Sequence, residues 1–386
     1  MTSESLAKVT NIKIEKGEKL DLNHILKANN LSLDDVVLHN DIVYNLPKKE
    51  YLESITPYTQ SKITFDLINS HQSVAIAFKR ILMGEYLNMQ MTTNYVTGSD
   101  ELVDKESTTS YLFIKQRIEC IAVNYDPSLK DLRMMIDVKN NSDTKYMLVH
   151  SNRIKFDTDK TKGLTEIDFK KLQFDKNIMI CSIAPRKSLK IEIELKIGAN
   201  TGSDKLNYRT CNNHSFTYKL PEFENINSLD FKISNLSIHA KNFKLGFECS
   251  HFIEPKVEIV RGINAFIKTL DTYKEIIKNI KDTTPLTYGL VTNEIFRNEL
   301  LTISKVFNES PMYIFDFYCQ THTLGNIIAW FYYKDNMNTP LICVEKTNAN
   351  DDFIRLNVGD QHFSQKIPIA IENAKKEFIK IKSYFE

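Results

Sequence analysis

The feature that most constrains this chain is a narrow apolar stripe that occurs in two helical segments. In "VRGINAFIKTLDTYKEIIKNIKD" the large apolar residues step by 3 or 4 positions, at Ile263, Phe266, Leu270, Tyr273, Ile277 and Ile280. In "IAIENAKKEFIKIKSYFE" the same steps occur at Ile371, Ala374, Phe378, Ile381 and Phe385. These steps are typical of a coiled-coil seam, which needs a partner surface. Two such helices in one chain favour mutual packing, and the alternative is that each helix packs on its own domain's sheet.

A strand followed by an amphipathic helix also occurs twice. In the first copy "ITFDLI" alternates apolar and polar residues, as a strand with one buried face does. The next segment, "HQSVAIAFKRILMGEY", has one apolar helical face and Ser70 as its expected N-cap: Val74, Phe78, Ile81, Leu82 and Tyr86. In the second copy "PMYIFDFYC" predicts a strand, and the helix after it has its own apolar face: Leu324, Ile327, Ile328, Phe331 and Tyr332. Because a heptad helix ends each copy, we interpret the pattern as a duplicated fold.

A β-rich pattern interrupts the first copy. Its clearest strand is "SLKIEIELKIG", in which apolar and charged residues alternate, so that one face is expected to be wet. The sequence therefore predicts an α+β chain. Its expected divisions are an N-terminal extension (1–60), a discontinuous first module (61–127 and 221–282), a β-rich insert domain (128–220), a linker region (283–309) and a second module (310–386).

Composition excludes several classes of protein. The chain has 386 residues, 42% of them hydrophobic, which is enough for two or three domains. Its formal net charge of +1 disfavours a free-standing DNA-binding protein. The six cysteines form no CxxC pair and the first residues show no apolar signal, so reduced cytosolic thiols are expected. No apolar run approaches the roughly 20 residues that span a bilayer, so no membrane association is expected.

The segment "THTLGN" has two interpretations from its residues alone. Its glycine and polar groups could hold a phosphate, because backbone N–H groups and the positive end of the helix dipole point there. They could equally cap the helix, with Thr323 as N-cap and Asn326 as its reciprocal partner. The capping interpretation needs no ligand, and we favour it.

This segment resembles part of the smaller alpha-like subunit of archaeal and eukaryotic RNA polymerases, in which HTLGN precedes an apolar helix. The match at 322–326 has no gap: His322, Thr323, Leu324, Gly325 and Asn326. The first half resembles the larger alpha-like subunit in order, at "FDLINSHQSVAIAFKRILMGE", "LFIKQRIECIAV", "IMICSIAPRKSLKIEIELKIGANTGSDKLNY" and "EPKVEIVRGI". The resemblance covers residues 61–386, and the ordered set is more specific than any single motif.

The resemblance implies two alpha-subunit-like dimerisation modules that form an intramolecular pseudo-dimer, with the insert in the first. It also implies a non-catalytic assembly platform of a DNA-dependent RNA polymerase. The implied partners are the largest and second-largest polymerase subunits and small assembly subunits, with DNA and RNA reached only through the complex. A fused chain resembles the arrangement in large cytoplasmic DNA viruses, which implies the host cytoplasm and virion. Otherwise an intracellular place with the transcription machinery is expected.

Roles for individual residues follow from the same resemblance. Lys79, Arg80 and Glu85 are implied in contacts with the large subunits, although a basic pair also commonly solvates a helix edge. The residues implied in intramolecular dimerisation are Val74, Phe78, Leu82, Ile263, Phe266, Leu270, Tyr273, Ile277, Thr323, Leu324, Gly325, Asn326, Ile328, Ile371, Phe378 and Ile381. The chain departs from the family pattern at Ile76, Lys79 and Ala329, which affects detailed contacts more than the fold.

Two other classes of function are alternatives. A metal-dependent enzyme could use four potential zinc ligands, Cys211, His214, Cys249 and His251. The tight cysteine cluster of zinc-binding alpha-like subunits is not present in the sequence, so we expect no metal and no other cofactor. A β-sandwich binding protein would leave the heptad helices unexplained. Since no acidic triplet of the kind that holds catalytic magnesium is evident, no catalytic residue is expected.

Overall fold

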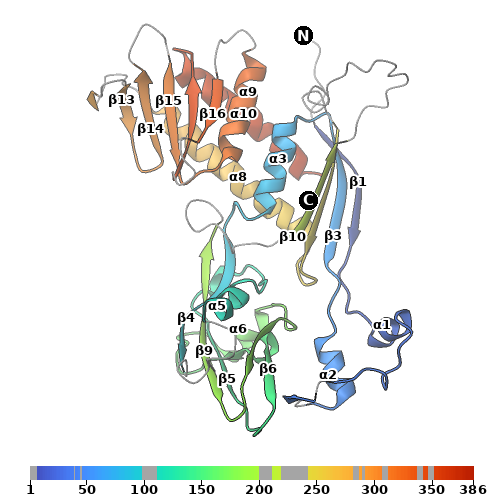
Figure 1. Cartoon of the computed structure of the whole chain (residues 1–386). Helices are drawn as coiled ribbons and strands as arrows, with labels where there is room; N and C mark the ends of the chain where they lie inside the picture. The colour runs from blue at the N-terminus through green and yellow to red at the C-terminus, as the bar shows by residue number, and fades with distance from the viewer. Residues whose placement is uncertain are drawn as a thin grey trace, which may run out of the picture.

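A computed structural model of the chain describes residues 7–38, 40–43, 46–97, 111–199, 211–218, 242–280, 287–288, 292–306, 312–336, 342–346 and 352–386. Within these residues the protein is a mixed α+β structure with four sheets, which confirms the predicted fold class at that level. Its buried apolar residues form two separate clusters. Figure 1 shows a corresponding division into an upper body and a lower lobe, which we call the insert.

The first unit of the upper body is a four-stranded antiparallel sheet with two helices. Its strand order is β1-β3-β11-β10, from Lys8–Glu15, Ser61–Ile68, Phe243–Cys249 and Cys211–Tyr218. Helix α3 (Gln72–Leu82) follows β3, and helix α8 (Pro255–Lys278) follows β11. Gly262 lets α8 approach α3 closely, because a Cβ there would lie 3.0 Å from the Ile81 Cγ2 atom. The apolar faces of both helices therefore enter the same core.

The second unit has a six-stranded sheet in the order β12-β13-β14-β15-β17-β16. These strands are Thr287–Tyr288, Thr292–Arg297, Leu301–Val306, Tyr313–Tyr318, Phe353–Val358 and Ile342–Glu345. Helix α9 (His322–Asp335) follows β15, and helix α10 (Phe363–Lys382) follows β17. Strands β13 and β14 lie in the region that the sequence predicted to be a linker, so that prediction was wrong there. The alternation of Leu301 and Ile303 with polar residues was the missed signal.

The two units share one topology. The order β14-β15-β17-β16 with its helices repeats the order β1-β3-β11-β10 with α3 and α8. His322 begins its helix where Gln72 begins the first, and Ile371 and Phe378 stand at the same interval from Ile263 and Leu270. The insert occupies the connection between α3 and β10, at the place where the second unit runs directly from α9 to β16.

Helices α8 and α10 pack side by side and antiparallel (Figure 1). Lys274 Nζ lies 2.6 Å from Glu372 Oε2, and Lys375 Nζ lies 2.8 Å from both carboxylate oxygens of Asp271. The Phe266 ring meets the Phe378 ring edge to face at 5.0 Å. All these seam contacts join residues of one hydrophobic cluster, so the two heptad helices share a core.

The insert has its own core and two sheets. One has the order β4-β9-β5-β7, from Asn88–Thr97, Ser188–Gly198, Arg133–Lys139 and Lys155–Phe156. The other has the order β2-β6-β8, from Ile42–Val43, Tyr146–His150 and Met179–Ile183. Helices α5 (Tyr111–Glu119) and α6 (Glu166–Lys171) belong to the same lobe.

The sheets divide the chain differently from the predicted ranges. Strand β4 pairs with β9 of the insert although it begins at Asn88, and Cys211–Tyr218 pairs with β11 of the first unit although it precedes residue 220. Alternation along one strand shows which residues share a face, but it does not identify the neighbouring strand. Strand partners were therefore beyond the sequence pattern.

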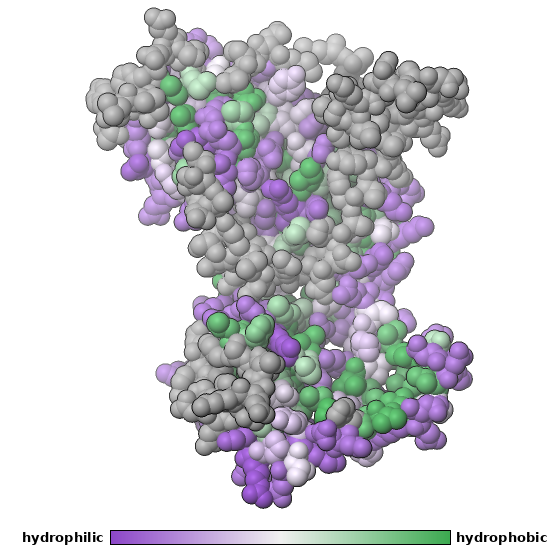
Figure 2. Space-filling view, viewed as in Figure 1, coloured by the Kyte–Doolittle hydropathy of each residue, from purple (hydrophilic) through white to green (hydrophobic). Residues whose placement is uncertain are grey.

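The N-terminal segment is integrated into both parts of the molecule. Strand β1 pairs with β3 in the first unit, and β2 pairs in parallel with β6 in the insert. Helices α1 (Leu22–Ala28) and α2 (Lys48–Ile55) lie beside the insert (Figure 1). Figure 2 shows apolar surface gathered in this region, where Leu31, Val37 and Leu46 are exposed.

Candidate interaction groove between α3 and α9

A groove of about 240 Å³ lies between helices α3 and α9, at the contact between the two units. Its lining residues come from one face of α3 and the first turn of α9: His71, Gln72, Ser73, Ile76, Ala77, Arg80, Thr323 and Asn326. Ile76 and Asn326 occupy equivalent positions in the repeated topology. The groove therefore brings together the basic end of α3 and the "HTLGN" segment, which the sequence singled out separately.

The N-caps of the two helices are not the predicted residues. His71 caps α3, because its Nδ1 accepts a hydrogen bond from the Ser73 N–H at 3.1 Å. Thr321 caps α9, because its Oγ1 accepts from the Thr323 N–H at 3.2 Å. The predictions of Ser70 and Thr323 as N-caps were wrong, since the helices begin at different residues from those expected. Ser70 instead donates to the buried Glu377 carboxylate at 3.0 Å, which links β3 to α10.

His71 also joins the two units through its ring. It stacks on Trp330 of α9 with 3.3 Å between ring centroids and 4° between ring planes. Burial lowers the pKa of His71 to about 4, and the charge of Lys334 acts in the same direction. At neutral pH the ring is therefore uncharged, as its role as a hydrogen-bond acceptor requires.

Glu85 lies at the other end of the groove. Its carboxylate accepts a hydrogen bond from Thr321 Oγ1 at 2.9 Å, so it contacts the second unit. Burial raises the pKa of Glu85, while the hydroxyls of Thr323 and Thr321 and the charge of Arg80 act in the opposite direction. Of the three residues predicted to contact large subunits, Glu85 is thus engaged within the chain.

Arg80 is the charged group that the groove leaves available. It lies half-buried in the last turn of α3, and no hydrogen-bond or ion-pair partner for it lies within the described residues. Asn326 is exposed beside it on the first turn of α9. A guanidinium with free donors and a neighbouring amide suits a carboxylate, which accepts two parallel hydrogen bonds from an arginine. Lys79 belongs to the same turn but does not line the groove.

The residues predicted for intramolecular dimerisation lie mostly in the shared core. The following belong to that single cluster: Val74, Phe78, Leu82, Ile263, Phe266, Leu270, Tyr273, Ile277, Leu324, Ile328, Ile371, Phe378 and Ile381. Gly325 faces strand β16, where a Cβ would lie 2.8 Å from Val344 Cγ1, so a glycine permits this close approach. Thr323 is buried beside them, and Asn326 faces the groove.

The residues of the metal alternative lie at the end of the first sheet. Cys211 and Cys249 are paired in register on β10 and β11, and the side chains of Cys211 and His214 lie outside the described part of the structure. His251 stacks on Tyr58, and its Nδ1 lies 3.5 Å from Asp175 Oδ1. Among the side chains that the structure describes, no three or more His, Cys, Asp or Glu residues are grouped to hold a metal ion.

The sequence reasoning missed His71, Thr321 and Trp330. His71 and Thr321 each stand directly before a helix, which was a usable capping signal. Stacking between His71 and Trp330 depends on tertiary contacts and had no signal in the sequence. Within the described residues, no helix is both long and apolar enough to span a membrane.

Comparison with known proteins adds no family assignment, because neither a protein-family model nor a curated protein sequence matches the chain. The functional interpretation therefore depends on the resemblance in the motifs and on the geometry described above.

Proposed function

We propose that this chain is a non-catalytic assembly platform of a multisubunit DNA-dependent RNA polymerase. In this proposal the two units are a pseudo-dimer of alpha-like modules, and together they bind the two large catalytic subunits. The observation that carries the proposal is the repeated strand order, with α8 and α10 antiparallel in one core. It is supported by the ordered motifs that resemble the larger and smaller alpha-like subunits.

A single chain suits this role for a physical reason. Separate modules must find each other in solution, whereas a short tether gives the second module an effective concentration of roughly millimolar. The shared core of α8 and α10 then leaves the α3 and α9 face for partners. Small assembly subunits would bind to the same complex, and DNA and RNA would be contacted only through it.

Arg80 is the residue that we assign to partner binding. Its guanidinium opens on the groove beside Asn326, and its nearest described charged neighbours, Glu85 and His322, feel its charge without pairing with it. We propose that a carboxylate of the second-largest polymerase subunit occupies this position. Glu85 has a different role, because its hydrogen bond to Thr321 fixes α9 against the end of α3.

Affinity purification tests this proposal. A tagged copy of the chain is produced in the cells in which it naturally occurs, and the bound proteins are identified and quantified. We expect the two large polymerase subunits at equal stoichiometry with the tagged chain. Recovery of the chain without them would contradict the proposed function.

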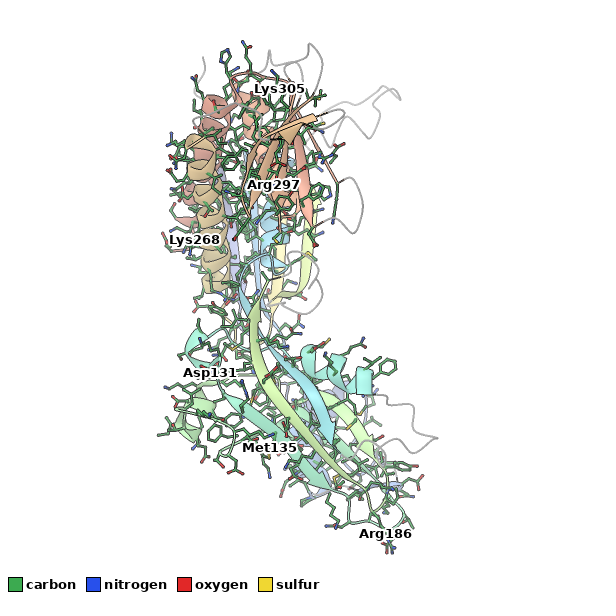
Figure 3. All side chains as sticks on the ribbon, turned by 90° about the vertical axis from the view of Figure 1, so that its left-hand side faces the viewer. Asp131, Met135, Arg186, Lys268, Arg297 and Lys305 are labelled. Atoms are coloured by element: carbon green, nitrogen blue, oxygen red, sulfur yellow. The ribbon has the colours of Figure 1, made fainter. Side chains whose placement is uncertain are left out.

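Replacing Arg80 with Glu tests the assigned contact. Reversing one charge of a buried interface pair costs about 2–5 kcal/mol, so recovery of the second-largest subunit should fall sharply. The matched control is Lys268→Glu, which reverses an exposed charge on α8 on the side of the molecule seen in Figure 3. Equal recovery with both variants would show that Arg80 is not the contact.

A further inference from the structure

The junction between the first unit and the insert is built around one arginine of α8. We propose that Arg261 is a positioning residue that holds the insert in a fixed orientation relative to the upper body. This inference goes beyond the assembly role, because it does not depend on which partner the chain binds.

The guanidinium of Arg261 bonds the chain where it enters the insert. Its Nη1 donates to the Leu87 carbonyl at 3.0 Å, and its Nη2 donates to Asn88 Oδ1 at 2.6 Å. Asn88 is fully buried and is the first residue of β4, the strand that enters the insert sheet. Two hydrogen bonds from one rigid group fix both the position and the direction of that strand.

Aromatic rings from both sides of the junction contact the same guanidinium. Its central carbon lies 4.2 Å from the ring centroid of Tyr125, which belongs to the insert. It lies 4.8 Å from the ring centroid of Tyr86, which belongs to the core of the upper body. A planar delocalised cation can stack on aromatic rings in this way, which the ammonium group of a lysine does not reproduce.

Glu258, one turn earlier on α8, holds the arginine in place. Its Oε2 accepts hydrogen bonds from Arg261 Nη2 at 2.6 Å and from the Tyr86 hydroxyl at 2.7 Å. Only 21% of the Arg261 side chain and 12% of the Glu258 side chain are exposed, so solvent competes little for these bonds. The arginine is therefore oriented before it contacts the insert.

Other described contacts across the junction are single hydrogen bonds. Ser250 Oγ donates to Asp175 Oδ2 at 3.0 Å, and Asn177 Nδ2 donates to the Thr56 carbonyl at 2.7 Å. Arg261 alone combines two hydrogen bonds to the entering strand with a stacking contact to the insert. Because the two parts have separate hydrophobic clusters, loss of this contact should release the orientation of the insert without unfolding either part.

Distance measurements between spin labels test the proposal in the full chain. One label replaces Lys268 on α8, and the other replaces Thr144 in the exposed loop of the insert whose Asp143 pairs with Arg186. Figure 3 shows Lys268 and Arg186 in different parts of the molecule. Both labels are attached to unnatural amino acids, so the native cysteines are left in place.

We expect one narrow distance distribution for the native chain and a broader one for Arg261→Ala. Arg261→Lys should broaden it as well, because lysine keeps the charge but loses the paired hydrogen bonds and the stacking. Arg297→Ala, which removes an exposed ion pair with Glu294 far from the junction, should leave the distribution narrow. A distribution for folded Arg261→Lys as narrow as that of the native chain would overturn the proposal.

Tyr125→Leu tests the same contact from the insert side and leaves Arg261 and its hydrogen bonds in place. This variant should also broaden the distribution, by less than Arg261→Ala. It keeps the inference testable if Arg261→Ala fails to fold. An unchanged distribution in Tyr125→Leu would contradict the stacking role.

Discussion

At the scale of single residues, the groove combines one neutral ring with one available cation. His71 is held neutral by its burial against Trp330, and Arg80 keeps its donors for a ligand. The two groups lie at opposite ends of α3, so one end of that helix is used to join the units and the other to receive a partner.

Protonation of His71 should destabilise the contact between the units. Its pKa is lowered from 6.5 to about 4 in the folded chain, so the unfolded chain binds the proton more readily between these values. The contribution of His71 to stability is therefore fully present above about pH 6.5 and is lost as the pH falls towards 4. The native chain should lose stability more steeply in this window than His71→Asn, in which asparagine can cap the helix without titrating.

Urea unfolding of both proteins at several pH values between 7.5 and 4.5 measures this difference. Other groups titrate in the same window, but they are common to both proteins and cancel in the comparison. Parallel stability curves for the native chain and His71→Asn would show that His71 is not held neutral by the fold.

Which residues were predictable depends on whether their role is local. The close approach at Gly325 and the seam positions Ile263 and Ile371 follow from residue type and spacing. The caps were missed by one or two positions, because several polar residues precede each helix and each could accept the hydrogen bond. The partnership of His71 with Trp330 joins segments far apart in sequence, so no local pattern could indicate it.

At the scale of elements, the two seam helices connect the first unit to the second. Their periodicity predicted helices with one apolar face. Their antiparallel direction is defined in the structure by the pairs Lys274–Glu372 and Asp271–Lys375. These partly exposed ion pairs are each worth at most about 1 kcal/mol, so most of the stabilisation comes from the buried seam.

Ile277→Glu should disrupt this contact. Ile277 is fully buried in the shared cluster, and a carboxylate there would lose its hydration without gaining a partner, which costs several kcal/mol. The free energy of unfolding from urea titration should fall by about 3–5 kcal/mol. Recovery of the large polymerase subunits should be lost together with it.

Lys278→Glu is the neighbouring control. That side chain is 50% exposed and makes one long ion pair with Glu275, so its reversal should change stability by about 0.5 kcal/mol or less. Similar losses in the two variants would mean that the seam does not carry the contact between the units.

At the scale of the whole molecule, the sequence predicted the duplication and the existence of an insert but not the assignment of strands. The pattern could not place β10 with the first unit or β4 with the insert, because pairing is decided by tertiary packing. It also could not show that the N-terminal segment supplies β1 to the first unit and β2 to the insert. These connections give the chain two bodies with a defined junction, which is the arrangement that a platform with a projecting arm requires.

The most direct test of the proposed function is template-dependent RNA synthesis by the complex that the tagged chain recovers. The complex is assayed with DNA template, nucleotides and magnesium, beside the same amount of the isolated chain. We expect synthesis by the complex and none by the isolated chain, because the sequence supplies no acidic cluster for catalytic magnesium. Synthesis by the isolated chain, or a recovered complex that is inactive and lacks both large subunits, would contradict the account.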